Sequence, residues 1–104
     1  MIWNYLTPGI PDELFERSEI VPITKEDIRS IVLSKLRLRK NYSVIDVGCG
    51  SGSITVEICL HVNSKKVYAI DLDKNAIDLT KKNLDKFGVS ANLIHSKAEE
   101  VLPS

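Results

Sequence analysis

The sequence has few of the features that mark secreted, membrane-spanning or metal-binding proteins. Only two of its 104 residues are cysteine, Cys49 and Cys59. A disulfide framework or a zinc site needs more ligands at tighter spacing, so we expect two reduced thiols, no metal and a cytoplasmic protein. The opening segment lacks the basic and apolar regions of a secretory signal, and no apolar run approaches the roughly 20 residues that span a bilayer. We therefore expect neither a signal peptide nor contact with a membrane.

The sequence also lacks an excess of either charge. Fourteen Lys and Arg side chains balance fourteen Asp and Glu side chains. Nucleic-acid binders usually carry a basic surplus that displaces counterions from phosphates. Aromatic residues are scarce, and Trp3 and the three tyrosines do not alternate with basic residues as a base-stacking surface would require. The composition therefore argues against an RNA or DNA substrate.

What remains is the composition of one globular domain, with 43% hydrophobic and 27% charged residues. Three of the four prolines fall in residues 1–23, where there is little periodicity, and we expect an irregular arm on the surface of the domain. Thr24 then resembles a helix N-cap. An amphipathic helix is predicted over residues 25–38, with an apolar face made of Ile28, Ile31, Val32 and Leu36.

Residues 43–95 alternate between strand-like and helical patterns. Strands are predicted at 43–48, 66–71 and 92–95, helices at 53–62 and 74–87, and a further helix from Glu99. Asp73 should cap the second of these helices, and Gly88 should end it. Right-handed crossovers give an α/β Rossmann-like sheet in the order 3-2-1. The first strand would then be an unprotected apolar edge, so we expect residues 24–104 to be the N-terminal half of a larger sheet.

The strongest functional signal lies between the first strand and the helix that follows it. There the chain reads Asp46-Val47-Gly48-Cys49-Gly50-Ser51-Gly52. Alternate glycines let the backbone turn sharply and approach a ligand. The spacing differs from the G-x-G-x-x-G pattern of dinucleotide sites, and a carboxylate at the strand end disfavours a pyrophosphate. A sulfonium cofactor with an α-ammonium group would accept that carboxylate. The pattern therefore predicts a site for S-adenosylmethionine, with Asp46 at its amino-acid end.

A second acidic residue, Asp71, closes the next strand about 20 positions later, where nucleoside sites hold ribose hydroxyls. The third strand is followed by Ser96-Lys97-Ala98-Glu99, so a lysine stands where an acid that binds adenine is common. The adenine contact is expected from Ser96 or from the backbone of Ala98. His61 and His95 have no partner at catalytic or ligand spacing, so we interpret them, like the two cysteines, as structural residues.

Two longer stretches are similar to known families. VIDVGCGSGSIT, followed by VYAIDLDKNAIDLTKKNL, resembles the class I methyltransferases, whose domain has seven strands. The resemblance of the arm is more specific than that of the glycine loop, because other class I methyltransferases lack it. Residues 9–15 read GIPDELF and residues 21–29 read VPITKEDIR, and both resemble the decarboxylating precorrin methyltransferases of cobalamin synthesis. Ile23 replaces a methionine that is common there. A later glycine pair of that family, which should face the substrate, has no counterpart in this sequence.

The resemblance implies methylation of carbon 15 of a cobalt-precorrin or precorrin, with loss of carbon dioxide from the acetate on ring C. It implies that Asp46, Gly48, Gly50, Gly52 and Asp71 bind the cofactor, with Thr24 and Ala98 as further contacts. Lys25, Arg29 and Arg17 are candidates for pairing with the carboxylates of a tetrapyrrole. We expect residues 9–29 to fold over the carboxyl ends of the strands, and the enzyme to be a homo-oligomer.

Three other functions stay open at this stage. A class I methyltransferase that acts on RNA or protein would share the cofactor half, although the neutral charge and the arm argue against it. A fragment that binds cofactor without activity of its own is a second possibility. A nicotinamide-dependent dehydrogenase fits the glycine spacing least well.

Overall fold

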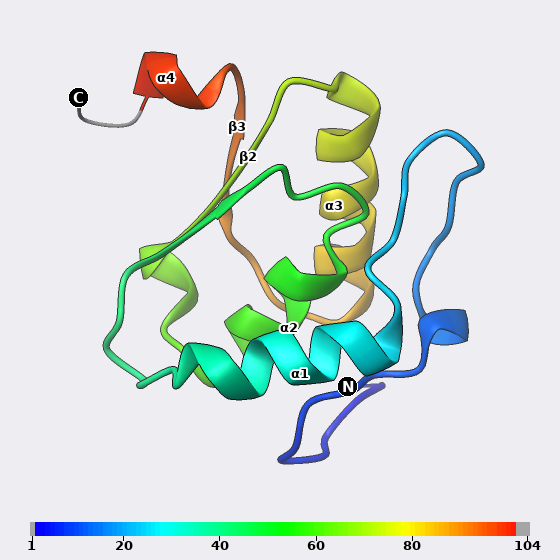
Figure 1. The fold of residues 1–104 in the computed structure, drawn as a ribbon, viewed down its shortest axis with the longest axis vertical. Helices are drawn as coiled ribbons and strands as arrows, with labels where there is room; N and C mark the ends of the chain where they lie inside the picture. Colours follow the sequence, from blue (N-terminus) through cyan, green and yellow to red (C-terminus); the bar gives the residue numbers. More distant parts are fainter. Residues whose placement is uncertain (1, 102–104) are drawn as a thin grey trace.

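The computed structural model describes residues 2–101 and contains three parallel strands, four α-helices and two short 3-10 turns in that range (Figure 1). Each predicted strand and helix is present, with bounds that differ from the prediction by at most two residues. In chain order the elements are η1 (Asp12–Leu14), α1 (Glu26–Leu36), β1 (Val44–Val47), α2 (Ser53–His61), η2 (Ser64–Lys66), β2 (Val67–Asp71), α3 (Lys74–Lys86), β3 (Asn92–His95) and α4 (Ala98–Val101).

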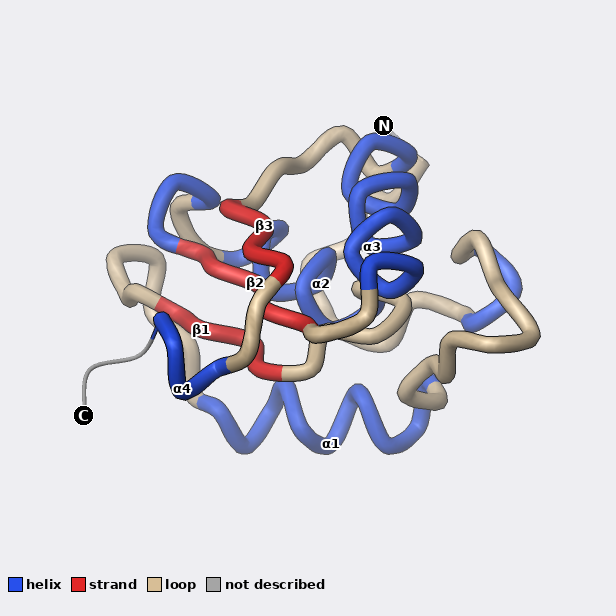
Figure 2. Tube along the Cα trace, turned by 90° about the horizontal axis from the view of Figure 1, so that it is seen from above, coloured by secondary structure: helices blue, strands red, loops and turns tan. Residues whose placement is uncertain are grey.

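The sheet has β2 in the middle, with β1 and β3 on either side, which confirms the predicted 3-2-1 order. Both pairings are parallel, and Asp46 lies opposite Ala69 while Ala69 lies opposite Leu93. Helices α2 and α3 pack against each other and against β2, and α1 packs on α2 (Figures 1 and 2). The fold is therefore the α/β half-sheet of Rossmann-like topology that the sequence predicts, and the carboxyl ends of its strands lie at one edge.

Helix α3 forms as its pattern predicts. Asp73 caps it by accepting a hydrogen bond from the Asn75 N–H at 2.9 Å. The residues that share one face of it at helical spacing are all buried: Ile77, Thr80, Leu84 and Phe87. Gly88 ends the helix in the left-handed conformation, with φ of 69°, as predicted. Local signals were sufficient here because the helix has one polar face and one buried face.

Helix α1 differs from its prediction in two respects. Its N-cap is Lys25 rather than Thr24, and no side chain caps it. The predicted apolar face is also wrong, because Ile28 and Ile31 are each 56% exposed and Leu36 is 44% exposed. The buried residues of this helix are Arg29 and Leu33. The helix has turned the charged side chain of Arg29 inward, since that side chain has partners inside the protein.

The arm does not lie on the surface as predicted. Ile10, Phe15 and Val21 are buried, and the first two belong to the main core together with residues of α2 and α3. Phe15 packs on Phe87 with ring centroids 5.0 Å apart. The prolines that made the arm look irregular also keep it extended, so that single apolar side chains enter the core without forming a helix or strand.

A buried ionic cluster joins the arm to α1 and α2. The Arg29 side chain is fully buried and forms salt bridges with Asp12 and, at 2.9 Å, with Glu57. Arg29 also donates to the backbone carbonyls of Ile10, at 2.6 Å, and Thr24, at 3.2 Å. Glu57 in turn accepts hydrogen bonds from the Gly9 and Ile10 N–H groups. Each buried charge is therefore paired and hydrogen-bonded, as burial requires.

One face of the sheet is uncovered in the part of the chain that the structure describes. Ile45 and Val47 of β1 are about half exposed, at 48% and 54%, and they alternate with the partly buried Val44 and Asp46. Within residues 2–101, β1 pairs with β2 alone. No helix among the described residues is long and apolar enough to cross a membrane.

The junction between α2 and α3 generates a prediction about Gly52. A Cβ atom on Gly52 would lie 2.8 Å from the Thr80 Cα, and its φ is +85°. Gly88 has a similar φ of +69° but has no atom within 4 Å of a built Cβ. Gly88→Ala should therefore cost only the left-handed conformation, about 1 kcal/mol. Gly52→Ala should add an overpacking cost and lower the free energy of unfolding by about 2 to 4 kcal/mol.

Urea denaturation of the two variants beside the wild-type protein tests this comparison. Equal losses in the two variants would contradict the close helix packing at Gly52.

Candidate functional site

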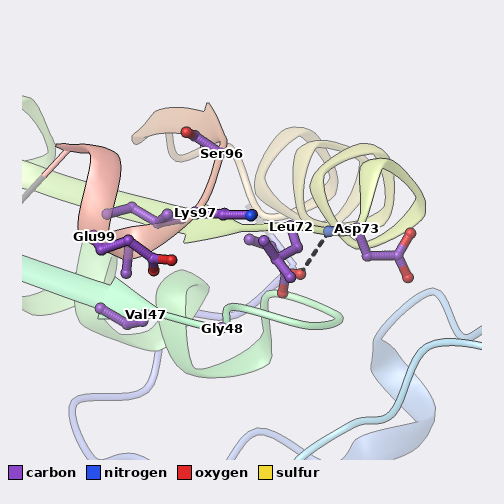
Figure 3. Close-up of a pocket in the computed structure, with 10 residues that line it drawn as sticks. Val47, Gly48, Leu72, Asp73, Ser96, Lys97 and Glu99 are labelled. Atoms are coloured by element: carbon purple, nitrogen blue, oxygen red, sulfur yellow. Dashed lines mark hydrogen bonds between the residues drawn. The ribbon is translucent and has the colours of Figure 1, made fainter.

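A cavity of about 570 Å³ opens at the carboxyl ends of the three strands (Figure 3). This is the edge where open α/β sheets bind ligands, and the volume is within the range of small-molecule sites. Each strand end and the loop that follows it contribute to the wall. The lining residues are Val47, Gly48, Ile70, Asp71, Leu72, Asp73, Ser96, Lys97, Ala98 and Glu99.

The glycine loop forms one wall of the cavity. The Gly48 and Cys49 N–H groups donate to the Ile70 carbonyl, at 2.7 and 3.2 Å, and so hold the loop on the end of β2. A Cβ built on Gly48 meets no atom within 4 Å, so this position borders open space. A Cβ on Gly50 would lie 3.2 Å from the Pro22 carbonyl oxygen of the arm. Gly48 thus faces the cavity, whereas Gly50 and Gly52 face the arm and α3.

Asp71 connects the glycine loop to the loop after β2. One of its carboxylate oxygens accepts a hydrogen bond from the Gly50 N–H at 3.1 Å, and the other accepts one from the Asp73 N–H at 2.9 Å. Asp71 is partly exposed and lines the cavity. A carboxylate has about four lone-pair positions, so both oxygens keep acceptor capacity toward a ligand.

Asp46 is not part of the cavity wall. Its carboxylate accepts a hydrogen bond from the Thr55 hydroxyl at 2.6 Å, which ties β1 to α2. Burial raises the pKa of Asp46, the Thr55 hydrogen bond opposes this shift, and the nearby Asp71 charge adds to it. Asp46 is therefore positioned to support the glycine loop from within the fold.

The end of β3 supplies the third wall. Ser96, Lys97, Ala98 and Glu99 all line the cavity, so Ala98 lies where it was predicted. Glu99 brings a carboxylate to this wall two residues after Lys97. Figure 3 shows Lys97 and Glu99 on one side of the cavity and Leu72 and Asp73 on another. The sequence reasoning missed Leu72, Asp73 and Glu99 as site residues, although their positions just after parallel strands could have indicated them.

The predicted arm residues do not line this cavity. The Thr24 carbonyl accepts a hydrogen bond from the Arg29 side chain, and Lys25 is an exposed residue at the start of α1. Arg29 was predicted to pair with a substrate carboxylate, and this is wrong, because its guanidinium is fully buried between Asp12 and Glu57. Arg17 lines a separate hollow of about 580 Å³ formed by arm residues 17–23. Pro22 of the arm lies beside Gly50 of the glycine loop.

The two histidines lie at the ends of secondary-structure elements. His61 is the last residue of α2. The His95 Nε2 lies 2.7 Å from the Leu72 carbonyl oxygen, so this ring braces the loop that borders the cavity. In the described range, no group of three or more His, Cys, Asp or Glu side chains could hold a metal ion.

Comparisons with known proteins identify the relatives of this chain. The sequence profile of the precorrin methyltransferase domain matches residues 13–104. A probable cobalt-precorrin-6B C(15)-methyltransferase (decarboxylating) of Saccharolobus solfataricus is 57% identical over 100 residues, which are 95% of this chain and 50% of the relative. The chain therefore spans about half the length of the curated relatives that it matches.

Two solved structures show the same fold. Precorrin 8w decarboxylase of Methanobacterium thermoautotrophicum superimposes with a TM-score of 0.74 and 36% identity, over 82% of this chain and 46% of that one. Precorrin-6y C5,15-methyltransferase of Geobacter metallireducens gives a TM-score of 0.81 with 28% identity, over 96% and 55% of the two chains.

Cys49 belongs to the glycine loop and Cys59 lies near the end of α2, and both thiols are expected to be unreactive. Burial raises the pKa of the Cys49 thiol to about 11 and that of the Cys59 thiol to about 12. For Cys49, the Thr80 hydroxyl 3.3 Å from the sulfur opposes the shift in pKa, and the Asp46 and Asp71 charges add to it. Neither thiol is ionised near neutral pH, so neither is available as a nucleophile.

Both thiols should therefore resist modification in the folded protein. At pH 8 their reaction with Ellman's reagent should be at least about a hundredfold slower than that of free cysteine, because the thiolate is the reactive form. The stabilisation that accompanies these raised pKa values should be present below the unfolded-state pKa of a thiol and lost as the pH rises through the folded-state values. Rapid labelling of either cysteine in the native protein would contradict this assignment, and labelling in denaturant provides the positive control.

Proposed function

Because the chain belongs to the precorrin methyltransferase family, we propose that it is the cofactor-binding half of an S-adenosylmethionine-dependent methyltransferase that acts on a corrin precursor. The observation that carries the proposal is the cavity at the strand ends. It is bordered by the open side of Gly48 and by the Asp71 carboxylate, both predicted as cofactor contacts from the sequence.

The chemistry of the cavity fits this cofactor. Its wall carries the carboxylates of Asp71, Asp73 and Glu99 against one ammonium group, that of Lys97. This excess of negative charge suits a ligand with a sulfonium and an α-ammonium group and opposes the pyrophosphate of a dinucleotide. Val47, Ile70 and Leu72 add apolar wall against which an adenine ring would pack.

Within this proposal the predicted cofactor residues have two roles. Gly48, Asp71 and Ala98 line the cavity and would contact the cofactor, with Asp71 accepting hydrogen bonds from ribose hydroxyls. Asp46, Gly50 and Gly52 belong to β1 and the glycine loop without lining the cavity, so we assign them to shaping the loop that the cofactor meets. Thr24 does not line the cavity either, and its carbonyl accepts a hydrogen bond from Arg29. Asp46 would then act on the amino-acid end of the cofactor through the loop rather than through a direct bond.

The proposed reaction follows from the relatives' names: methylation at C15 of a cobalt-precorrin, coupled to decarboxylation. When bound, the cofactor supplies a methyl group already activated on positive sulfur. The residues of this chain would hold that group in line with the attacking ring carbon, and positioning of this kind can supply about 7 to 11 kcal/mol. The conjugated macrocycle would accept the electron pair released with carbon dioxide, so no catalytic acid or base is required of this half.

The remaining assignments are proposals that rest on fewer observations. We propose an arm of residues 1–23 and a cofactor-binding unit of residues 24–104, ranges that extend beyond the described residues. A cytoplasmic location is supported by the two free, buried cysteines. A homo-oligomer is supported by the exposed apolar side chains on the uncovered sheet face.

The cofactor assignment predicts a binding preference. Calorimetry should show tighter binding of S-adenosylmethionine or S-adenosylhomocysteine than of NAD. Asp71→Ala should weaken that binding by about 1 to 3 kcal/mol, because ribose hydroxyls would lose their acceptor and the glycine loop would lose a brace. Asp78→Ala is the matched control, since Asp78 is an exposed carboxylate that pairs only with Lys74. Tighter binding of NAD would refute the assignment.

The substrate assignment predicts a role for Lys25. This side chain is exposed beside the arm and is free to meet a carboxylate of the tetrapyrrole. Lys25→Ala in the active enzyme should raise KM more than it lowers kcat, because a charge clamp holds ground state and transition state alike. Lys35→Ala, an exposed lysine at the other end of α1, should leave both constants unchanged.

The assay supplies cobalt-precorrin-6B or its metal-free equivalent with labelled cofactor and follows methyl incorporation together with carbon dioxide release. Methylation of transfer RNA with the tetrapyrrole untouched would show that the function belongs to another class of methyltransferase.

A further inference from the structure

Asn83 of α3 is a fully buried polar side chain that bonds two segments distant in sequence. Its Oδ1 accepts a hydrogen bond from the Glu16 N–H at 2.7 Å. Its Nδ2 donates to the Glu16 carbonyl at 3.1 Å and to the Ser51 carbonyl at 2.8 Å. One amide group therefore holds the main chain of the arm and the main chain of the glycine loop at the same time.

Thr80, three residues earlier on the same face of α3, also holds the glycine loop. Its hydroxyl is 3.0 Å from the Gly50 carbonyl oxygen and donates to it. Two consecutive loop carbonyls, those of Gly50 and Ser51, are thus turned toward α3 and fixed there. Gly52 packs directly on Thr80, which leaves the loop little freedom on this side.

The arm reaches the same loop a second time at Pro22. The Pro22 carbonyl oxygen lies 3.2 Å from the position of a Cβ on Gly50. Val21 is buried against Ala76 and Leu79 of α3, so the segment between the two contacts is seated on this helix. Residues 16–22 therefore form a strap that is bonded to Asn83 at one end and meets the cofactor loop at the other.

We propose that Asn83 is a positioning residue that couples the order of this strap to cofactor binding at the glycine loop. The inference rests on the proposed function, because it concerns the same cavity. Coupling of this kind is reciprocal. A ligand that stabilises the ordered glycine loop also stabilises the ordered strap, and a substitution that loosens the strap lowers the affinity for the ligand. The strap begins in the arm that carries the family-specific sequence, so the coupling links that arm to the cofactor site.

A pair of substitutions at Glu16 separates the strap contact from the helix. Glu16→Pro removes the N–H that donates to Asn83 and leaves α3 intact. Phe15 has an extended backbone, with φ of −91° and ψ of 148°, which a following proline favours. Glu16→Ala is the matched control, because it keeps the N–H and loses only the exposed side chain with its 3.8 Å contact to Lys86. Asn83→Asp tests the contact with the glycine loop, because it replaces the amide that donates to the Ser51 carbonyl with a group that accepts.

The measurements are the Kd for S-adenosylhomocysteine and the hydrogen exchange of the amides of residues 17–21, with and without that ligand. In the wild-type protein and in Glu16→Ala the ligand should slow this exchange. In Glu16→Pro the exchange should be faster, and Kd should rise about 3- to 10-fold relative to Glu16→Ala. Asn83→Asp should raise Kd by at least as much, while Cys59→Ala, a buried substitution away from the loop, should destabilise the fold without this effect.

Two results would count against the coupling in different ways. If the wild-type protein binds the ligand and Glu16→Pro matches the Kd of Glu16→Ala within twofold, the coupling is refuted and the proposed function stands. If the wild-type protein does not bind S-adenosylhomocysteine at all, the proposed function fails and this inference fails with it.

Discussion

The buried pairing of Arg29 with Asp12 and Glu57 is the interaction on which the rest of this structure depends. It brings together the arm, α1 and α2, and all three groups are satisfied by one another or by backbone groups. Removing one partner from such a cluster leaves an unpaired buried charge, which is far more costly than the net contribution of the intact pair. The cluster therefore fixes the course of the arm across the helices. The positions of Phe15, Val21 and Pro22 depend on that course.

That path explains how a segment without regular structure belongs to the site. Outside the short turn η1 the arm offers several of its backbone N–H and C=O groups to side chains of other elements. Glu57 and Asn83 take up these groups from two different helices. The glycine loop has the same character, since its carbonyls are bonded by side chains of α3. Two irregular segments are thus held rigid by the buried faces of α2 and α3, which leaves the open side of Gly48 as the surface presented to a ligand.

The parts predictable from the sequence were those whose signals are local. The periodicity of α3, its cap at Asp73 and the strand-loop-helix context of the glycines each lie within a few adjacent residues, and each prediction was confirmed. The buried face of α1 could not be predicted in this way, because Arg29 finds its acids 17 residues before it and 28 after it. Apolar periodicity predicted the wrong buried face of α1, because the paired charge of Arg29 is buried while Ile28 and Ile31 are exposed. The hydrogen bond of Asp46 could not be predicted either, because its partner Thr55 belongs to the next helix; the contact of Asp46 with the cofactor stays a prediction.

The hydrogen bond between Asp46 and Thr55 also bears on how this sheet avoids self-association. In the described part of the chain, β1 is an edge strand of four residues with half-exposed apolar side chains on one face. Edge strands of this kind recruit further strands and aggregate unless something interrupts them, and an inward-pointing charge on a short strand is one of the interruptions that proteins use. A second copy of this strand pairing in register would bring another Asp46 carboxylate beside this one, and like charges at that distance repel. The carboxylate that bonds Thr55 inside the molecule thereby disfavours self-pairing of β1 in the described part of the chain.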